Sequence, residues 1–399
     1  MIGKIGLLLA MMLVIAANAQ NSFQDSLQQL NDEKAKVRMT AAWDLGKSGD
    51  ARAVDPLIKH LDDKDEDVRA WVVLALANLG QPAIDPLIEA LTDDSRTIRW
   101  QASAALGLIG DARAAQPLAE ALADRSNATR YWSAIALGQI NNSSSRGPLI
   151  QALGDADRAV RDAAGWALLR VEGAEAIDLL ISILKEDNSS RRMGAAAALG
   201  KMDDSRAVQH LVSTLEDPED EVRAIAAASL GRFNDINSIE HLVQALSDDS
   251  GDVRSKAKRS LARIGQPAVG ALILALDEGD DLQKAEAAEA LGEIGDIRAI
   301  DPLIEAFKEG EARLRHNAVL ALIKLNKTAG VETFLDLLKA ERSEVRSDAA
   351  WALGLSGDAG AKSSLLQTMA EDEDRNVRLN ATIAIRKLGG KWEPVALKF

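Results

Sequence analysis

Residues 98–119 read IRWQASAALGLIGDARAAQPLA, and much of this succession of a basic residue, small apolar residues, a Leu-Gly pair and a turn returns along the chain. Each copy carries one basic residue, called here the anchor, which usually follows Val or Ile. The interval between neighbouring anchors is nearly constant, as from 69 to 99 and from 346 to 378. This period predicts twelve stacked repeats instead of separate domains. The anchors are Arg38, Arg69, Arg99, Arg130, Arg161, Arg192, Arg223, Arg254, Lys284, Arg315, Arg346 and Arg378.

Each anchor lies within an apolar pattern that has the period of an α-helix. Positions −1, +3, +7 and +10 from the anchor are mostly apolar, and this spacing forms one face of a helix. Position +7 holds Leu in eleven repeats and Ile385 in the last. The residue before it is nearly always small, as in Ala75 and Ala136, which allows a neighbouring helix to approach closely. We therefore predict an anchor helix in every repeat.

Acidic loops and glycines mark the ends of the predicted anchor helices. The loop at 62–65 is typical, and its aspartates are suited to cap a helix and to favour its positive end. Such loops lack the regular acid spacing and the central glycine of a calcium loop, so capping is favoured over metal binding. Gly80, Gly110 and Gly265 predict helix ends. Pro56 then predicts the start of a second helix, called here the companion helix.

The repeat resembles the HEAT-like repeats of the phycobilisome-lyase group. The residues that carry the resemblance are Ile98, Arg99, Ala104, Ala105, Leu106, Gly107, Ile109, Gly110, Asp111, Arg113, Ala114, Pro117 and Leu118. The resemblance covers about 22–390 and implies an all-α, right-handed α-solenoid, a superhelix of about twelve two-helix repeats of about 31 residues. It also implies that the anchor helices line the concave face. The matching residues are core and capping residues, so they predict the fold and carry no activity.

The composition restricts the partners and the chemistry. The chain of 399 residues has a formal charge of -14, a pI near 4.9 and no cysteine. Nucleic-acid binding needs clustered Lys and Arg, so we expect a protein or peptide partner and no nucleic acid. The lack of cysteine excludes disulfides, thiolate metal sites and a cysteine nucleophile.

The N-terminal segment has the pattern of an export signal. A lysine precedes an uncharged apolar run at 5–17, and Ala17-Asn18-Ala19 is a small-x-small cleavage site. The run is too short to span a bilayer, which takes about 20 residues. We expect export to the periplasm, the cell surface or the medium, with retention of the segment as a membrane anchor as the alternative. The predicted divisions are a signal peptide at 1–19, a solenoid at 20–390 and a terminal cap at 391–399.

Six of the seven tryptophans and the only tyrosine fall on outward positions of the predicted anchor helices, at +1, +2 or +5. A row of exposed aromatic rings marks a partner-binding face. Helices stacked roughly 10 Å apart would extend such a row over about 40–50 Å. The alternative is that each indole folds onto a neighbouring helix and completes the packing. The candidate binding residues are Trp43, Trp71, Trp100, Tyr131, Trp132, Trp166 and Trp351.

Repeat eight places cations on the outward positions, and repeat nine places acids on the equivalent face. Two interpretations remain open: ion pairs between the two helices, or contact with an anion or an acidic peptide. Lys258 stands where other repeats have a small core residue, so loose local packing is expected. The cations are Lys256, Arg259 and Arg263, and the acids are Glu286, Glu289 and Glu293.

Catalytic arrangements are lacking in the sequence. The four histidines, His60, His210, His241 and His316, are not followed by Glu. In deoxyhypusine hydroxylase, which is built from similar repeats, His-Glu pairs hold the iron. Bilin-lyase subunits of the group chaperone a pigment, but an exported chain is in the wrong compartment for phycobilisome assembly. We expect a monomeric scaffold that binds a protein or peptide in its concave groove, with no catalytic residue, metal or cofactor. The alternative is a bilin-lyase-like or deoxyhypusine-hydroxylase-like enzyme or accessory factor.

Overall fold

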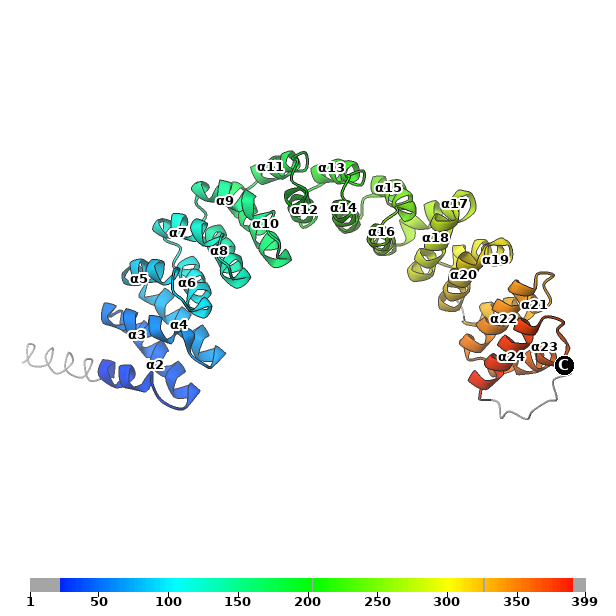
Figure 1. Ribbon diagram of the computed structural model, residues 1–399, viewed down its shortest axis with the longest axis horizontal. Helices are drawn as coiled ribbons and strands as arrows, with labels where there is room; N and C mark the ends of the chain where they lie inside the picture. Colours follow the sequence, from blue (N-terminus) through cyan, green and yellow to red (C-terminus); the bar gives the residue numbers. More distant parts are fainter. Residues whose placement is uncertain (1–21, 203, 326, 390–399) are drawn as a thin grey trace, which may run out of the picture. The chain divides into compact units, whose positions relative to one another are not determined.

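The computed structural model describes residues 22–202, 204–325 and 327–389. Within these ranges the ordered elements are helices, and no strand is present. Every anchor lies on an α-helix, and between successive anchor helices the chain forms one shorter companion helix, often preceded by a 3-10 turn (Figure 1). The predicted all-α solenoid is therefore confirmed. The predicted signal peptide and the terminal cap lie outside the described residues.

The anchor helices are α2 (Ala35–Ser48), α4 (Glu66–Leu79), α6 (Arg96–Ile109), α8 (Asn127–Ile140), α10 (Arg158–Glu172), α12 (Ser189–Leu199), α14 (Asp220–Phe233), α16 (Gly251–Ile264), α18 (Asp281–Ile294), α20 (Ala312–Leu325), α22 (Ser343–Ser356) and α24 (Arg375–Lys387). The companion helices are α3 (Val54–Lys59), α5 (Ile84–Ala90), α7 (Ala115–Ala121), α9 (Arg146–Ala152), α11 (Glu175–Ile183), α13 (Arg206–Thr214), α15 (Ile239–Gln244), α17 (Val269–Glu278), α19 (Ile300–Glu309), α21 (Lys327–Leu337) and α23 (Lys362–Glu371).

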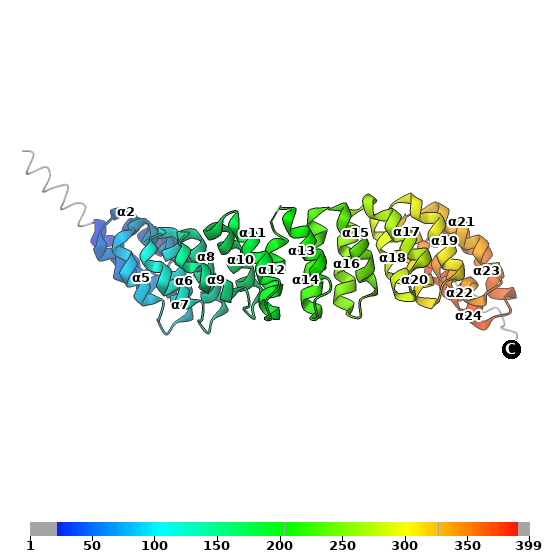
Figure 2. The same ribbon diagram turned by 90° about the horizontal axis from the view of Figure 1, so that it is seen from above.

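The chain divides into two compact units, Met1–Ala198 and Leu199–Phe399. In each unit the anchor helices form one layer and the companion helices form the other (Figures 1 and 2). Among the described residues, no single helix is long and apolar enough to cross a membrane. Only α4 with the segment Gln81–Ala90 reaches that length and composition, as a pair bent by 115°.

The core lies between the two layers of each unit. The twelve aliphatic residues at position +7, from Leu45 to Ile385, are all at most 7% exposed. The predicted apolar face is thus confirmed. The predicted caps are confirmed as well, because the side chains of Asp65, Asp157 and Asp374 accept backbone N–H groups at the starts of α4, α10 and α24.

Glycine at position +8 sets how closely neighbouring anchor helices pack. At Gly292 an added Cβ would lie 2.6 Å from Cα of Ala321 on the next anchor helix, so only glycine allows this approach. Two successive anchor helices are closely packed in the described junctions where the first helix has this glycine. They are more loosely packed where the first helix has Ala77, Ala262 or Ile323 at the same position. The other close pairs in this set follow Gly46, Gly107, Gly138, Gly231 and Gly354.

The two layers of a unit differ in packing. Anchor helices pack against one another more closely than companion helices do, for example α6 on α8 compared with α7 on α9. The more closely packed layer lies on the inner side of the bend within each unit (Figure 1). Small residues at +6 and +8 therefore place the anchor helices, and the side chains on their outward positions, on the inner face.

Substitution of Gly292 by Ala should destabilise the Leu199–Phe399 unit by roughly 1–3 kcal/mol, because the new Cβ overlaps the Ala321 backbone. Gly270 on α17 is the matched control, since nothing lies within 4 Å of its added Cβ. Gly270→Ala should stabilise the unit by about 0.4–1 kcal/mol. Urea unfolding followed by circular dichroism measures both changes. Equal effects of the two substitutions would contradict the role given to close packing.

Candidate partner-binding face

The aromatic side chains of the predicted stripe are all at least partly accessible. Trp43 is 39% exposed and Trp166 is 37% exposed. Trp71, Trp100, Tyr131, Trp132 and Trp351 have intermediate exposure. Each comes from an anchor helix, so in the Met1–Ala198 unit six of these rings project from one layer. We call the six aromatic residues of this unit the aromatic face.

The rings of the aromatic face are grouped across closely packed helix pairs. Trp43 of α2 meets Trp71 of α4 edge-on, with ring centroids 5.3 Å apart. Trp100 of α6 stacks on Trp132 of α8 at 6.0 Å, and Tyr131 lies 5.4 Å from Trp132. Each group spans a closely packed junction between two repeats, and the more loosely packed junction between α4 and α6 separates the two groups. The aromatic contacts therefore form separate groups along this layer.

Packing and exposure coexist in these indoles. A Cβ added at Gly138 of α8 would lie 2.6 Å from Cζ3 of Trp166, so the indole rests on the glycine of the neighbouring helix. The guanidinium of Arg170 lies 5.6 Å from the centroid of the same ring. The apolar area is extended by Leu74, which is 45% exposed, and by Leu108, which is 50% exposed. One side of each ring completes the packing, and the accessible remainder is available for contact.

Trp351 belongs to the Leu199–Phe399 unit and stacks on a histidine. The ring centroids of Trp351 on α22 and His316 on α20 are 4.9 Å apart, with an interplanar angle of 26°. His60, His210 and His241 follow the anchor helices, on or next to α3, α13 and α15, as their position in the repeat predicted. In the part of the chain that the structure describes, no group of three His, Cys, Asp or Glu residues is placed to hold a metal ion.

The basic residues of repeat eight correct one prediction. One of the two interpretations was ion pairs from Lys256, Arg259 and Arg263 to the acids of repeat nine, but these side chains form no such pairs among the described residues. Lys256 instead lies 3.7 Å from Asp252 on its own helix. Arg259 and Arg263 are exposed and form no ion pair with any residue that the structure describes.

Lys258 forms ion pairs of the kind that one interpretation gave to the other cations. Its position, +4, faces α18, and its Nζ lies 2.9 Å from Glu286 and 2.6 Å from Glu289. Burial opposes the charge of Lys258, but the hydrogen bonds from the two glutamates outweigh it and raise the pKa of the ammonium group. Glu286, which is 5% exposed, also pairs with Arg313 at 2.6 Å. A buried carboxylate thus gathers cations from two neighbouring helices.

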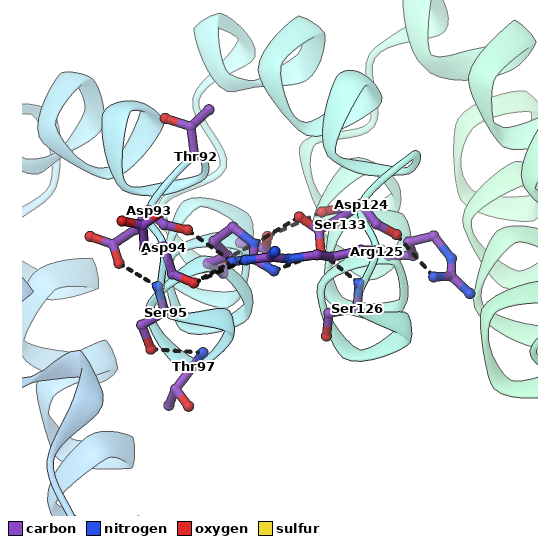
Figure 3. Close-up of polar contacts among 12 residues, drawn as sticks. Thr92, Asp93, Asp94, Ser95, Thr97, Asp124, Arg125, Ser126 and Ser133 are labelled. Atoms are coloured by element: carbon purple, nitrogen blue, oxygen red, sulfur yellow. Dashed lines mark hydrogen bonds and ion pairs between the residues drawn. The ribbon is translucent and has the colours of Figure 1, made fainter.

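Anchor arginines form a contact that the repeat pattern did not reveal. Nε and Nη2 of Arg99 donate to the carboxylate of Asp124 in the next repeat at 2.7 and 3.0 Å. Nη1 donates at 2.8 Å to the carbonyl of Asp93, in the loop before its own helix. Asp124 also accepts the N–H of Ser126 at 2.7 Å, which organises the start of α8. The loop residues Asp93 and Asp124 flank this contact in Figure 3.

We call this arrangement an arginine latch, because one guanidinium joins the loops that precede two successive anchor helices. In every latch the arginine donates two bonds to an aspartate of the following loop and one to the carbonyl six residues before itself. Among the described contacts, the same arrangement is formed by Arg38–Asp63, Arg130–Asp155, Arg223–Asp248 and Arg346–Asp372.

Three latch carboxylates have a lowered pKa in spite of their burial. Burial alone would raise the pKa of Asp63, Asp124 and Asp248, but the hydrogen bonds from the arginine outweigh it, and the pKa of each is lowered. A lowered carboxyl pKa in the folded state stabilises the protein above the ordinary pKa of 3.8 and loses this effect as the pH falls below that value. The latches thus hold neighbouring repeats together at neutral pH.

Latches are missing where the repeat pattern changes. After Arg69 and after Arg254 the next repeat begins one position early, because a shorter turn after Gly80 or Gly265 replaces the Gly-Asp turn. Nε of both arginines is buried and has no hydrogen-bond partner among the described residues. The same two junctions are among the loosely packed helix pairs, so latch and glycine contact are lost together.

Comparison with known proteins identifies the family. HEAT repeats are matched at residues 24–102, 84–146, 119–200, 147–231, 239–323 and 300–386, so the chain belongs to the HEAT-repeat family. Residues 222–248 also match the PBS lyase HEAT-like repeat.

Individual relatives are more distant. Deoxyhypusine hydroxylase of Eremothecium gossypii is 29% identical over 98 residues, which are 24% of this chain and 30% of that protein. Kap121p bound to Pho4p is similar in structure, with a TM-score of 0.52, 15% identity, and 93% of this chain covering 49% of Kap121p. Human deoxyhypusine hydroxylase in complex with glycerol matches 63% of this chain and 99% of its own at 27% identity, with a TM-score of only 0.27. The likeness to Kap121p shows a shared fold.

Asp63→Asn should break the first latch and leave the buried guanidinium of Arg38 without a charged partner. Breaking a buried pair costs roughly 3–5 kcal/mol. The loss should be largest at pH 7 and smaller at pH 3, because the stabilisation that comes from the lowered pKa of Asp63 is progressively lost below the ordinary pKa of 3.8. Urea unfolding at both pH values measures the difference. Arg158→Gln, which removes an exposed pair with Asp162, is the control and should change stability by less than about 1 kcal/mol.

Proposed function

We propose that this HEAT-repeat protein is a non-enzymatic scaffold that binds a protein or peptide on the aromatic face of the Met1–Ala198 unit. The observation that carries the proposal is the position of six aromatic rings on one layer, all at least partly accessible. Tryptophan and tyrosine are the residues most often responsible for binding energy at protein interfaces. Kap121p, which has this fold, is bound to Pho4p in its structure, so the fold holds a protein partner in that case.

The chemistry of the aromatic face favours an apolar partner segment. The exposed residues Leu74 and Leu108 belong to the same anchor helices as Trp71 and Trp100, and Gln101 is almost buried. Charges near the rings are few, and two of them, Lys47 and Arg170, lie over Trp43 and Trp166. A partner that buries apolar side chains there loses little solvation of charged groups, whereas a strongly charged partner finds few countercharges.

Replacing Trp71, Trp100 and Trp132 together by Ala should weaken partner binding by more than about 30-fold, since hot-spot truncations cost roughly 2 kcal/mol or more each. The fold should survive because these rings lie outside the core. A pull-down from the envelope fraction, followed by titration of the recovered partner, measures the loss. The control replaces Ile236, Leu274 and Ile297 by Ala, which are 70%, 59% and 74% exposed on or near companion helices. Equal retention of the partner by both variants would refute the proposed face.

We also propose export to the periplasm, the cell surface or the medium, on the pattern of residues 1–19 in the sequence. N-terminal sequencing of the protein recovered from the producing cells should begin at Gln20. Recovery of an intact N-terminus in the membrane fraction would favour the retained anchor instead.

The competing function is a deoxyhypusine-hydroxylase-like activity, supported by the partial match to deoxyhypusine hydroxylase, or a bilin-lyase-like activity, supported by the PBS lyase HEAT-like repeat at 222–248. Purified protein without stoichiometric iron and without pigment absorbance would favour the scaffold. Iron at one or two equivalents per chain, or a bound tetrapyrrole spectrum, would favour the enzyme.

A further inference from the structure

A cavity of about 790 Å³ lies between repeats nine and ten of the Leu199–Phe399 unit. Helices α17, α18, α19 and the start of α20 form its wall. Leu276, Leu282 and Leu314 supply apolar lining. The volume falls within the roughly 300–1,000 Å³ of ligand pockets. Five carboxylates also line the cavity, from Asp277, Asp281, Glu305, Glu309 and Glu311.

This junction should carry an arginine latch, but its anchor is Lys284. In most latches the aspartate follows the anchor at a separation of 25 in the sequence, as Asp124 follows Arg99, and Glu309 stands at that separation from Lys284. A lysine ammonium is a point charge that lacks the planar fork of arginine. Neither Lys284 nor Glu309 forms an ion pair within the described part of the chain, so the latch is absent here.

The charges around the cavity do not balance. Glu305 is paired with Lys308 at 2.9 Å, and Arg313 is paired with Glu286 at 2.6 Å. The other four lining carboxylates have no ion-pair partner among the residues with described side chains, and Lys284 is the one lining cation left to face them. An apolar cavity with surplus negative charge matches a ligand that has an aliphatic stem and a cationic head.

We propose that this cavity binds an arginine side chain of a basic protein segment, whose guanidinium takes the place of the missing latch. The latches described above show how the scaffold holds a guanidinium, with a forked contact on a loop carboxylate and a further bond to a loop carbonyl. At this junction the stem lies on Leu276 and Leu314, and the head meets Glu309 and Glu311. The site is separate from the aromatic face, and either one can fail without the other.

The test is fluorescence anisotropy with the full chain and a labelled peptide, Ala-Leu-Arg-Leu-Ala amide, at about 0.1 M salt. The same peptide with citrulline in place of arginine keeps the shape and loses the charge. The citrulline peptide should bind at least tenfold more weakly, roughly the loss of one charge-assisted forked contact. The double variant Glu309→Gln with Glu311→Gln should lose as much affinity for the arginine peptide. Equal affinity of the two peptides, or no binding of the arginine peptide at millimolar concentration, overturns the proposal.

Two further variants separate this site from general electrostatic attraction. Lys284→Arg leaves the net charge unchanged and supplies the latch from within the chain, so it should raise the melting temperature and reduce peptide affinity about tenfold. Glu240→Gln with Glu332→Gln removes two exposed carboxylates of the same unit away from the cavity and should leave affinity unchanged. Undiminished peptide binding by the Lys284→Arg variant, or equal loss in both glutamine doubles, rules out the latch position as the site.

Discussion

The bond between an anchor guanidinium and the loops on both sides of a repeat junction sets the register of neighbouring anchor helices. In the Arg38–Asp63 latch both side chains are at most 8% exposed, so removing them from water is costly. The cost is offset because the carboxylate oxygens accept from Nε and Nη2, while Nη1 donates to a loop carbonyl. Such a buried pair fixes geometry more than it adds net stability, since the contact forms only when successive loops are in register.

Glycine at +8 and the latch restrict the same junction from two ends. The latch holds the beginnings of two anchor helices, and the glycine allows their later turns to touch, as Gly138 touches Ala167. Where an anchor helix has this glycine, the positions that face the next anchor helix at that height therefore have room for small side chains alone. Bulky rings fit only on the outward positions, which explains why Trp43 and Trp166 are accessible although they rest on neighbouring helices. Close packing within the layer and exposure of the aromatic face thus have one cause.

Local periodicity was enough to predict the fold, because the core residues at +7, the caps and the helix ends depend on neighbours close in the sequence. Contacts between repeats were harder to predict. Lys258 was expected to loosen the packing, because other repeats have a small core residue at its position. The neighbouring helix α18 places Glu286 and Glu289 within ion-pair distance of it. The latches were not predicted either, because the recurring arginine was used only to define the period of the repeat. Its partner stands in the loop before the next anchor helix, whose acids were assigned to capping.

Two positions, Lys258 and Lys284, depart from the residue type that most repeats have there, and they differ in whether other residues compensate for the change. At Lys258 a small core residue is exchanged for a cation, and two glutamates compensate for it. At Lys284 an anchor arginine is exchanged for a lysine, and no described residue completes the latch. The charge introduced by the first change is neutralised by residues of the same fold, whereas the second change leaves a cavity whose carboxylates outnumber the cations. Departures from local rules in natural proteins are expected at functional or strained sites, and the break at Lys284 is accompanied by a cavity, so repeat nine is a better place to expect a second ligand than the basic stretch of repeat eight.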